Sequence, residues 1–69
     1  MITASVKLEL DEDTHFEALQ WLDKNVGNIA FYRDAVSFER PWAYNAIFGG
    51  YEYYFAKEED ASLFIMRWK

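Results

Sequence analysis

The residues that could support catalysis or bind a metal are few in this chain, and they gather near one acidic run. His15 is the only histidine, and there is no cysteine, so thiolate zinc sites, disulfide bonds and cysteine nucleophiles are excluded. As a general base, His15 would need an orienting carboxylate, which Asp11, Glu12 or Asp13 could supply. A single histidine at the start of a helix is more often a polar surface residue, and the sequence therefore predicts no catalytic residue.

The acidic run 11–13 and the pair Gly49-Gly50 both lack the partners that a binding motif needs. A calcium loop requires more oxygen ligands at set spacing and a turn glycine, so the acidic run is expected to be a solvated turn. A phosphate-binding loop requires a following lysine or helix start, so the glycine pair is expected to form a hairpin turn. We therefore expect no metal, no cofactor and no enzymatic activity.

Length and composition limit the chain to one domain, residues 1–69, with a small core. A domain of this size buries only about 60% of its unfolded surface, and the aromatic residues, which make up 20% of the chain, must supply much of the core. The net charge of −5 disfavours phosphate backbones and anionic lipids. The sequence thus predicts no membrane partner, makes nucleic acid an unfavourable partner, and favours a basic protein.

The first residues of the chain do not resemble a targeting segment. They lack a basic region followed by about 7–15 apolar residues, which a signal peptide would show. No apolar run approaches the roughly 20 residues needed to cross a bilayer. Together with the lack of cysteine, this pattern leads us to expect a cytoplasmic protein.

Alternation and capping signals predict a strand and then a helix in the first part of the chain. Apolar residues at every second position over 4–10 are typical of a half-buried strand. Thr14 and Glu17 have the spacing of a capping box, which places a helix over residues 14–26, ending before Gly27. Its buried stripe is expected to consist of Leu19, Leu22 and Val26, with Phe16 on the flank.

Alternating apolar residues predict further strands in the middle of the chain. Residues 29–38 fit a second strand, but Asp34 interrupts the pattern and indicates a bulge or a later start. Alternating aromatic residues on both sides of Gly49-Gly50 predict a hairpin. Its expected cross-strand pairs form an aromatic wall on one face: Phe48 with Tyr51, Ala46 with Tyr53, and Tyr44 with Phe55.

A final helix is predicted after the acidic run 58–60, because acids in a first turn favour the positive end of the helix dipole. Its expected buried stripe is Ala61, Phe64, Ile65 and Trp68. The element order is therefore β-α-β-β-β-α, or β-α-β-β-α if residues 29–33 form a loop. We expect the α+β class: a two-layer sandwich with two helices on one face of an antiparallel-rich sheet, the other face being left to solvent or a partner. This arrangement resembles a ferredoxin-like plait that lacks its last strand.

The segment 50–55 and the helix after it resemble part of an RNA-recognition domain. In that family the strand presents aromatic side chains on which bases stack, and Gly50, Tyr51 and Tyr53 match the motif. Other positions depart from it, and the net charge weakens attraction to phosphates. We therefore predict that Tyr51 and Tyr53 belong to the packed aromatic face, and a single-stranded nucleic-acid binder that uses them stays the alternative.

Three large apolar residues fall outside the expected buried stripes of the two helices. Trp21 projects away from the stripe of the first helix, and Leu63 and Met66 lie opposite the stripe of the last helix. In a domain this small, such residues indicate a surface that is covered by another molecule. A two-fold interface would bury each of them twice, so we predict a homo-oligomer, a dimer or larger, whose interface includes Trp21, Leu63 and Met66.

The end of the chain combines an aromatic strand, the acids at 58–60, and the ending Ala61-x-x-Phe64-x-x-Arg67-Trp68. This combination resembles small uncharacterised proteins of tailed bacteriophages, particularly those of marine hosts. It implies a phage protein that acts in the host cytoplasm, and it supplies no activity. The predicted function is that of a non-enzymatic interaction or structural protein. Besides the nucleic-acid binder, a second alternative is a small enzyme whose site forms where His15 from two chains meets acidic residues.

Overall fold

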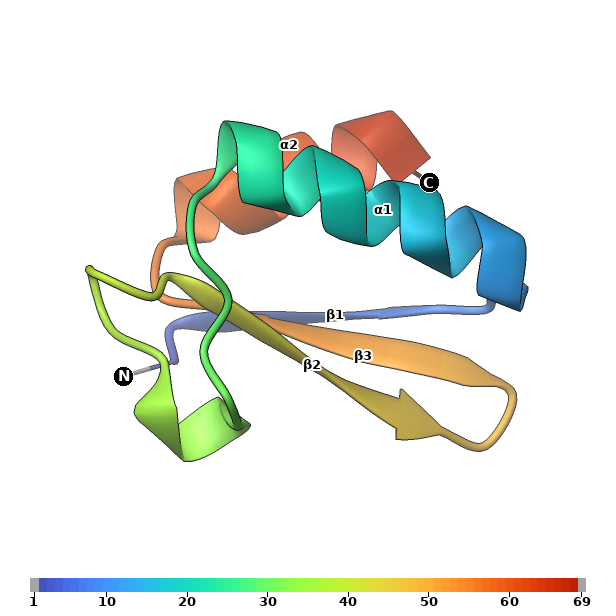
Figure 1. Cartoon of the computed structure of the whole chain (residues 1–69), viewed down its shortest axis with the longest axis horizontal. Helices are drawn as coiled ribbons and strands as arrows, with labels where there is room; N and C mark the ends of the chain where they lie inside the picture. Colours follow the sequence, from blue (N-terminus) through green and yellow to red (C-terminus); the bar gives the residue numbers. More distant parts are fainter. Residues whose placement is uncertain (1, 69) are drawn as a thin grey trace.

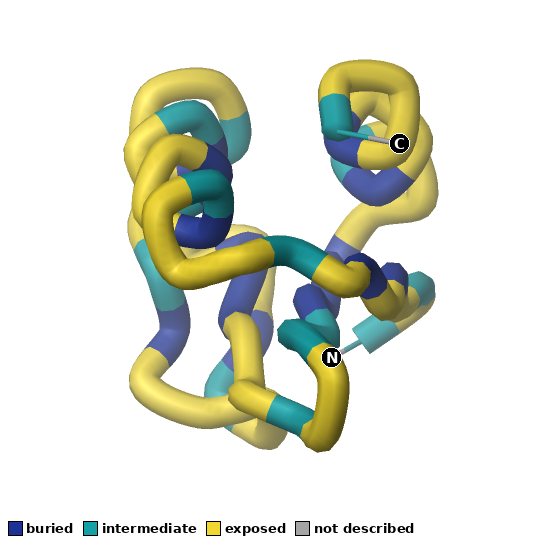
Figure 2. Tube along the Cα trace, turned by 90° about the vertical axis from the view of Figure 1, so that its right-hand side faces the viewer, coloured by how far each residue is buried: buried dark blue, intermediate teal, exposed yellow. Residues whose placement is uncertain are grey.

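A computed structural model describes residues 2–68 and arranges them in two layers (Figure 1). The elements in chain order are strand β1 (Ala4–Leu8), helix α1 (Glu12–Asn25), the short 3-10 helix η1 (Arg33–Ala35), strands β2 (Trp42–Ile47) and β3 (Gly50–Phe55), and helix α2 (Glu58–Trp68). Both helices lie on one side of the sheet (Figures 1 and 2). The predicted α+β class is confirmed, with the shorter of the two predicted element orders.

The sheet has three antiparallel strands in the order β1-β3-β2. Because β3 pairs with both neighbours in antiparallel fashion, β1 and β2 run parallel to each other with β3 between them. Helix α1 connects the two outer strands, which makes a split β-α-β unit. Consequently β1 and β2 are both edge strands. Within residues 2–68, neither helix is long and apolar enough to cross a membrane.

The hairpin turns one residue earlier than the sequence predicted. Ile47 pairs with Gly50, so the two loop residues are Phe48 and Gly49 rather than Gly49-Gly50. Gly49 takes a positive φ of 86°, as the turn requires. Gly50 is required for a different reason: the backbone of β1 comes so close that a Cβ atom at position 50 would collide with the carbonyl oxygen of Leu8.

The earlier turn corrects the predicted cross-strand pairs but keeps the aromatic face. Each partner on β3 shifts by two residues, and side chains alternate between faces with a period of two, so the same side chains still face the helices. Phe48 is the exception, since it is fully exposed at the turn. The observed pairs are Ala46 with Tyr51, Tyr44 with Tyr53, and Trp42 with Phe55.

Helix α1 is capped by Asp11, not by Thr14 as predicted. The Asp11 carboxylate accepts a hydrogen bond of 2.8 Å from the backbone N–H of Thr14, so α1 begins at Glu12 and the predicted capping box with Glu17 is wrong. The earlier start moves His15 from the first to the fourth helical position. The buried face of α1 consists of His15, Ala18 and Leu22, with Leu19 and Val26 half-buried and Phe16 exposed.

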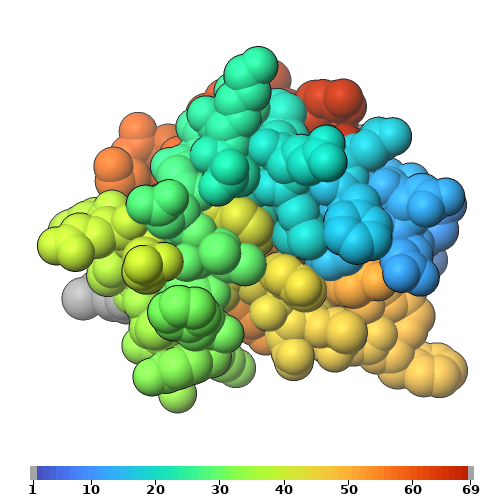
Figure 3. Space-filling model, in the orientation of Figure 1, coloured from blue at the N-terminus to red at the C-terminus, as the bar shows by residue number. Residues whose placement is uncertain are grey.

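Residues 29–38 do not form the predicted second strand. Ile29 makes one isolated parallel bridge with Trp42, and the chain then turns through η1 and crosses the sheet face opposite the helices (Figure 1). In the space-filling view this segment, coloured green to yellow-green, forms the lower left of the surface (Figure 3). Part of the face that the sequence left to solvent or a partner is therefore covered. The small cluster beneath contains Ala30, Val36, Ala43, Tyr54 and Ala56.

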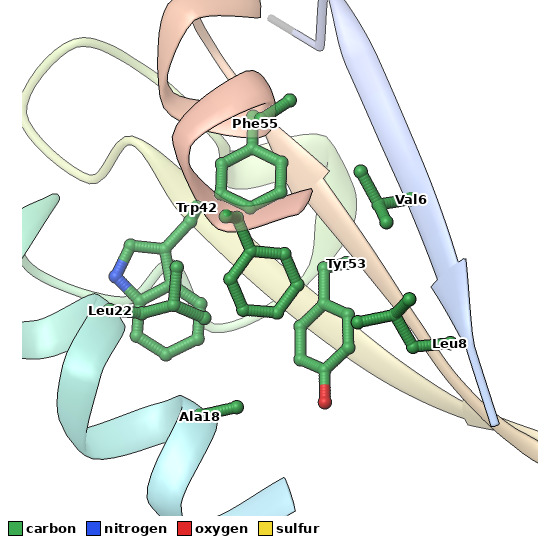
Figure 4. Packing of buried hydrophobic residues seen from close by; sticks show 9 residues of the cluster. Val6, Leu8, Ala18, Leu22, Trp42, Tyr53 and Phe55 are labelled. Carbon is green, nitrogen blue, oxygen red and sulfur yellow. The ribbon is translucent and has the colours of Figure 1, made fainter. Parts of the chain in front are cut away.

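The main core lies between the helices and the sheet (Figure 4). Helix α2 contributes Ala61 and Phe64, which are buried. Ile65, which the sequence placed on the buried stripe, is 38% exposed, and Trp68 is half-buried. The stripe of α2 is thus narrower than predicted. The other members of the core are Val6, Leu8, Ala18, Leu22, Trp42, Tyr53 and Phe55.

Candidate functional site

The group with the most distinctive chemistry joins α1 to the hairpin, and we call it the histidine–tyrosine cluster: His15, Tyr44, Tyr51 and Tyr53. His15 points toward the sheet because it belongs to the buried face of α1. The three tyrosines share the parity of the hairpin face that α1 covers. The sequence therefore brings these four rings together through one helix face and one sheet face.

The imidazole of His15 contacts all three tyrosine rings. Its Nδ1 atom lies 2.6 Å from the Tyr53 hydroxyl. The ring stacks on Tyr51 with centroids 3.6 Å apart and planes within 2° of parallel, and it meets Tyr44 edge-on at 4.6 Å. His15 is only 5% exposed and Tyr53 is fully buried, so their hydrogen bond lies inside the protein, whereas Tyr44 and Tyr51 keep part of their surface in solvent.

Both partners of the buried hydrogen bond are held in their neutral forms. Burial lowers the pKa of His15, opposed by the charge of Glu12. Burial also raises the pKa of Tyr53, with smaller contributions from Tyr51 and Tyr44. The imidazole tautomer decides the direction of this hydrogen bond: the Tyr53 O–H donates to Nδ1 when the ring proton is on Nε2, and Nδ1–H donates to the hydroxyl oxygen when it is not.

The hydrogen bond and ring contacts of His15 anchor one element of the fold to another. No carboxylate within residues 2–68 is hydrogen-bonded to His15, and that of Asp11 caps α1 instead. In the same part of the chain, no group of three or more histidine, aspartate or glutamate residues could hold a metal ion. Since the ring is enclosed by tyrosines of its own chain, little of it can meet a second subunit. The cluster fixes α1 against the hairpin.

Tyr51 and Tyr53 lie on the helix-covered face of the sheet, and the prediction that they belong to the packed aromatic face is confirmed. Tyr51 is stacked on His15, and Tyr53 has no exposed surface. A base-stacking strand must offer an open ring. These two residues therefore do not form an open platform of the kind found in RNA-recognition domains.

The three residues predicted for an interface have different surroundings. Leu63 and Met66, on the outer surface of α2, are 53% and 81% exposed. Trp21 is half-buried and packs against Phe64 of α2, with ring centroids 6.1 Å apart. The structure therefore brings Leu63 and Met66 together on an open surface and places Trp21 in the contact between the helices.

Sequence reasoning missed a second exposed surface, the aromatic–cationic loop of residues 31–40. Phe31 and Phe38 are 83% and 81% exposed, and each lies under a cation: Arg40 is 5.2 Å from the Phe31 ring and Lys57 is 5.8 Å from the Phe38 ring. A hollow of about 260 Å³ beside β2 is lined by Phe31, Tyr32, Arg33, Tyr44, Asn45 and Tyr54. The interleaving of aromatic and basic residues was visible in the sequence, but the strand assignment hid its exposure.

In comparisons with protein-family models, with curated proteins and with solved structures, nothing matched the chain.

Proposed function

We propose that this is a non-enzymatic interaction protein that assembles with copies of itself. The observation that supports this most is the exposure of Leu63 and Met66, three residues apart on α2. Large apolar side chains that share an exposed surface on a small domain mark a site of association. Burying one of them is worth about 1.5–3 kcal/mol before association costs are subtracted. In this proposal Trp21 supports the surface from below, by holding α2 against α1.

The proposal also covers the fold family, the origin of the protein, its place of action and an additional partner. The split β-α-β unit and the sheet order support a likeness to a ferredoxin-like plait without its last strand. The C-terminal resemblance supports a phage origin, with the host cytoplasm as the place of action, and the net charge of −5 favours a basic protein as an additional partner. Gene order tests the origin: phage genes are expected on both sides of the coding sequence, and bacterial housekeeping genes there would contradict it.

Sedimentation equilibrium tests self-association directly. The wild-type chain is examined up to about 100 µM, where an association worth about 5 kcal/mol would be half complete. The variant Leu63→Glu/Met66→Lys replaces the apolar pair by opposite charges at a spacing that supports a helix. Phe16→Lys is the matched control, because Phe16 is 57% exposed on α1.

We expect an oligomeric wild type, a weakened or monomeric double variant, and a control that behaves like the wild type. A monomeric wild type over the whole range would refute self-association. An oligomer that the double variant leaves unchanged would refute the role of Leu63 and Met66 and move the interface elsewhere.

A second candidate function is the binding of single-stranded nucleic acid through the aromatic–cationic loop. The observation that favours it is the exposed Phe31 ring beside the Arg40 guanidinium group, with the exposed Tyr32 and Arg33 lining the hollow next to it. Bases stack on such surfaces, and arginine adds charge. Fluorescence anisotropy with labelled single-stranded RNA tests it: micromolar binding that weakens with salt and is lost in Phe31→Ala supports it, and no binding at low salt refutes it.

A further inference from the structure

We infer that two copies of this chain join through the free edge of β1, antiparallel and around a two-fold axis, so that their three-stranded sheets become one continuous sheet. This inference rests on the proposed self-association and adds a second contact between copies, at the sheet edge, to the surface of Leu63 and Met66. An unpaired edge strand offers a row of backbone donors and acceptors to another chain. The two edges of this sheet are not equally open, and that difference selects β1.

The outer edge of β2 is partly occupied by its own chain. Ile29 bridges to Trp42, and the backbone N–H of Ala30 donates a hydrogen bond of 2.7 Å to the Trp42 carbonyl oxygen. Tyr32 and Arg33 then line a hollow beside the next residues of β2. Among residues 2–68, no backbone group pairs with the outer edge of β1.

The register of the sheet identifies which backbone groups of β1 are free. In a hairpin with a two-residue loop, the residues that flank the loop form a hydrogen-bonded pair, here Ile47 and Gly50. Hydrogen-bonding direction alternates along each strand, so Tyr51 and every second residue after it on β3 face β1. Their partners on β1 are Leu8, Val6 and Ala4. The residues between them, Ser5 and Lys7, therefore direct their N–H and C=O groups outward.

These free groups define one preferred pairing with a second copy. If Ser5 pairs with Lys7 of the second copy, and Lys7 with Ser5, all four outward groups of each β1 are used. The two-fold axis then passes beside Val6. On the helix side, Val6 meets its own copy, and Leu8 meets Ala4 of the second copy, which places apolar side chains opposite each other.

Helix α2 is placed so that this pairing also joins the helical layers. It contacts both β1 and β3, so it lies roughly one strand spacing, about 4.8 Å, from the two-fold axis. The two copies of α2 would be about 10 Å apart, which is an ordinary distance between packed helices. Strand pairing and helix packing therefore fit the same two-fold arrangement.

The flank of α2 that would face the second copy contains Ile65. At about 100° per residue, Asp60 and Ile65 lie on opposite sides of the Ala61–Phe64 stripe. Helix α2 runs antiparallel to α1 (Figure 1), and its right-handed turn puts Ile65 on the side away from α1. Ile65 is 38% exposed although it adjoins the core stripe. A second copy at β1 would cover it.

The charges at the two ends of α2 are complementary in this arrangement. The first turn carries Glu58, Glu59 and Asp60, and the last turn carries Arg67. A two-fold axis perpendicular to the helices makes the two copies of α2 antiparallel, so the acidic end of each lies beside the basic end of the other. Opposite charges at close range favour association even though the chain as a whole is acidic.

The first test blocks the free edge without touching the β1–β3 ladder. Ser5→Pro removes only an outward N–H and is tolerated on an edge strand, and Ser5→Ala is the matched control. By sedimentation, Ser5→Pro should associate about tenfold or more weakly, because two inter-chain hydrogen bonds are lost per dimer. Circular dichroism checks that the variant is folded.

The second test reports the register and does not depend on the proline variant. Because the chain has no cysteine, Ser5→Cys and Lys7→Cys chains can be mixed in equal amounts and oxidised. Hydrogen-bonded partners on antiparallel strands have Cα atoms about 5.5 Å apart, within disulfide range. The mixed disulfide should predominate over both homodimers, and Ser5→Cys mixed with Glu17→Cys, whose new thiol is on the exposed surface of α1, should not cross-link above the random level.

The outcomes separate this inference from the function on which it rests. A monomeric wild type overturns both. An oligomeric wild type with an undiminished Ser5→Pro oligomer, or with a random distribution of disulfides, overturns pairing through β1 and leaves self-association standing.

Discussion

The hydroxyl group of Tyr53 and Nδ1 of His15 are 2.6 Å apart, although 38 positions separate the two residues in the sequence. This hydrogen bond joins the central strand of the sheet to the first helix inside the core. A buried donor or acceptor that loses its partner costs more than the bond itself contributes. The two residues therefore stabilise the fold only as a pair.

Removing the hydroxyl of Tyr53 tests this pairing. Tyr53→Phe should lower the free energy of unfolding by about 1–3 kcal/mol, because Nδ1 of His15 stays buried without a partner. Urea denaturation measures the change. Tyr44→Phe is the matched control, since the Tyr44 hydroxyl makes no hydrogen bond within residues 2–68 while its ring also contacts His15. Equal losses in the two variants would contradict the role of the bond.

The burial of His15 predicts a loss of stability in mild acid. The pKa of His15 in the folded protein lies below its usual value of 6.5, because burial disfavours the charged ring. As the pH falls below 6.5, the unfolded chain therefore binds the proton before the folded chain does. The contribution of neutral, buried His15 to the free energy of unfolding is therefore complete above pH 6.5, and it is lost as the pH falls from 6.5 to the pKa of His15 in the folded protein.

Urea unfolding between about pH 8 and pH 5 measures this dependence, and His15→Phe should flatten it. Asp11 does not interfere in that range: its pKa is lowered from 3.8 by hydrogen bonds from Thr14, so its contribution is lost only in stronger acid. The proton resonances of the single imidazole give its pKa directly. A value at or above 6.5 would show that the ring is not buried as described.

Neighbouring residues on α2 should differ sharply in their contribution to stability. Phe64 is fully buried, so Phe64→Ala should cost about 3–5 kcal/mol, which is enough to unfold much of a small domain. Ile65 is 38% exposed, so Ile65→Ala should cost about 1 kcal/mol or less. Thermal melts at concentrations low enough to keep the chain monomeric compare them, and similar melting temperatures would mean that the helix face is wrongly assigned.

The two adjacent glycines of the hairpin should tolerate substitution differently. Gly49→Asn should stay close to the wild type, because asparagine adopts positive φ more readily than most residues and no atom lies within 4 Å of the added Cβ. Gly50→Asn should cost about 1–3 kcal/mol, since its Cβ displaces the end of β1 at Leu8. Chemical denaturation measures the free energy of unfolding of both variants. A Gly50 variant as stable as the Gly49 variant would contradict the close approach of Gly50 to the Leu8 carbonyl group.

Much of the fold could be predicted because side-chain periodicity survives small errors in position. The hairpin turn was placed one residue late, yet Tyr51, Tyr53 and Phe55 still face the helices. A shift of two in the partner residue preserves the alternation of faces. The predicted burial of Phe64 is likewise correct, although the buried stripe assigned to α2 was too wide because it included Ile65.

The segment 29–38 shows where periodicity fails. Its alternating apolar residues resemble a strand. An apolar residue at every second position, however, does not distinguish a strand paired in a sheet from a loop packed against the face of a sheet. Here Ala30 and Val36 are buried under the sheet by an irregular loop, while Phe31 and Phe38 are left exposed. The interruption at Asp34 was the sequence signal for this outcome, since η1 forms around it.

Helical spacing put His15 roughly on the side of the buried stripe, but the histidine–tyrosine cluster could not be predicted from that spacing alone. With the cap at Thr14, His15 stood at the edge of the helix. With the cap at Asp11, it lies one turn before Ala18 and two before Leu22 on the buried face. The sequence also could not show that Tyr53 would supply its partner, because that contact depends on how the two layers pack.

The central position of β3 determines when this protein can fold during its synthesis. The ribosome releases β1, α1 and β2 first, and these elements contain no two strands that are neighbours in the sheet. Each outer strand must wait for residues 50–55, which pair with both of them. Nascent chains that stop before Gly50 therefore lack the strand with which both β1 and β2 pair, and the apolar residues of β1 and α1 have no complete core to enter.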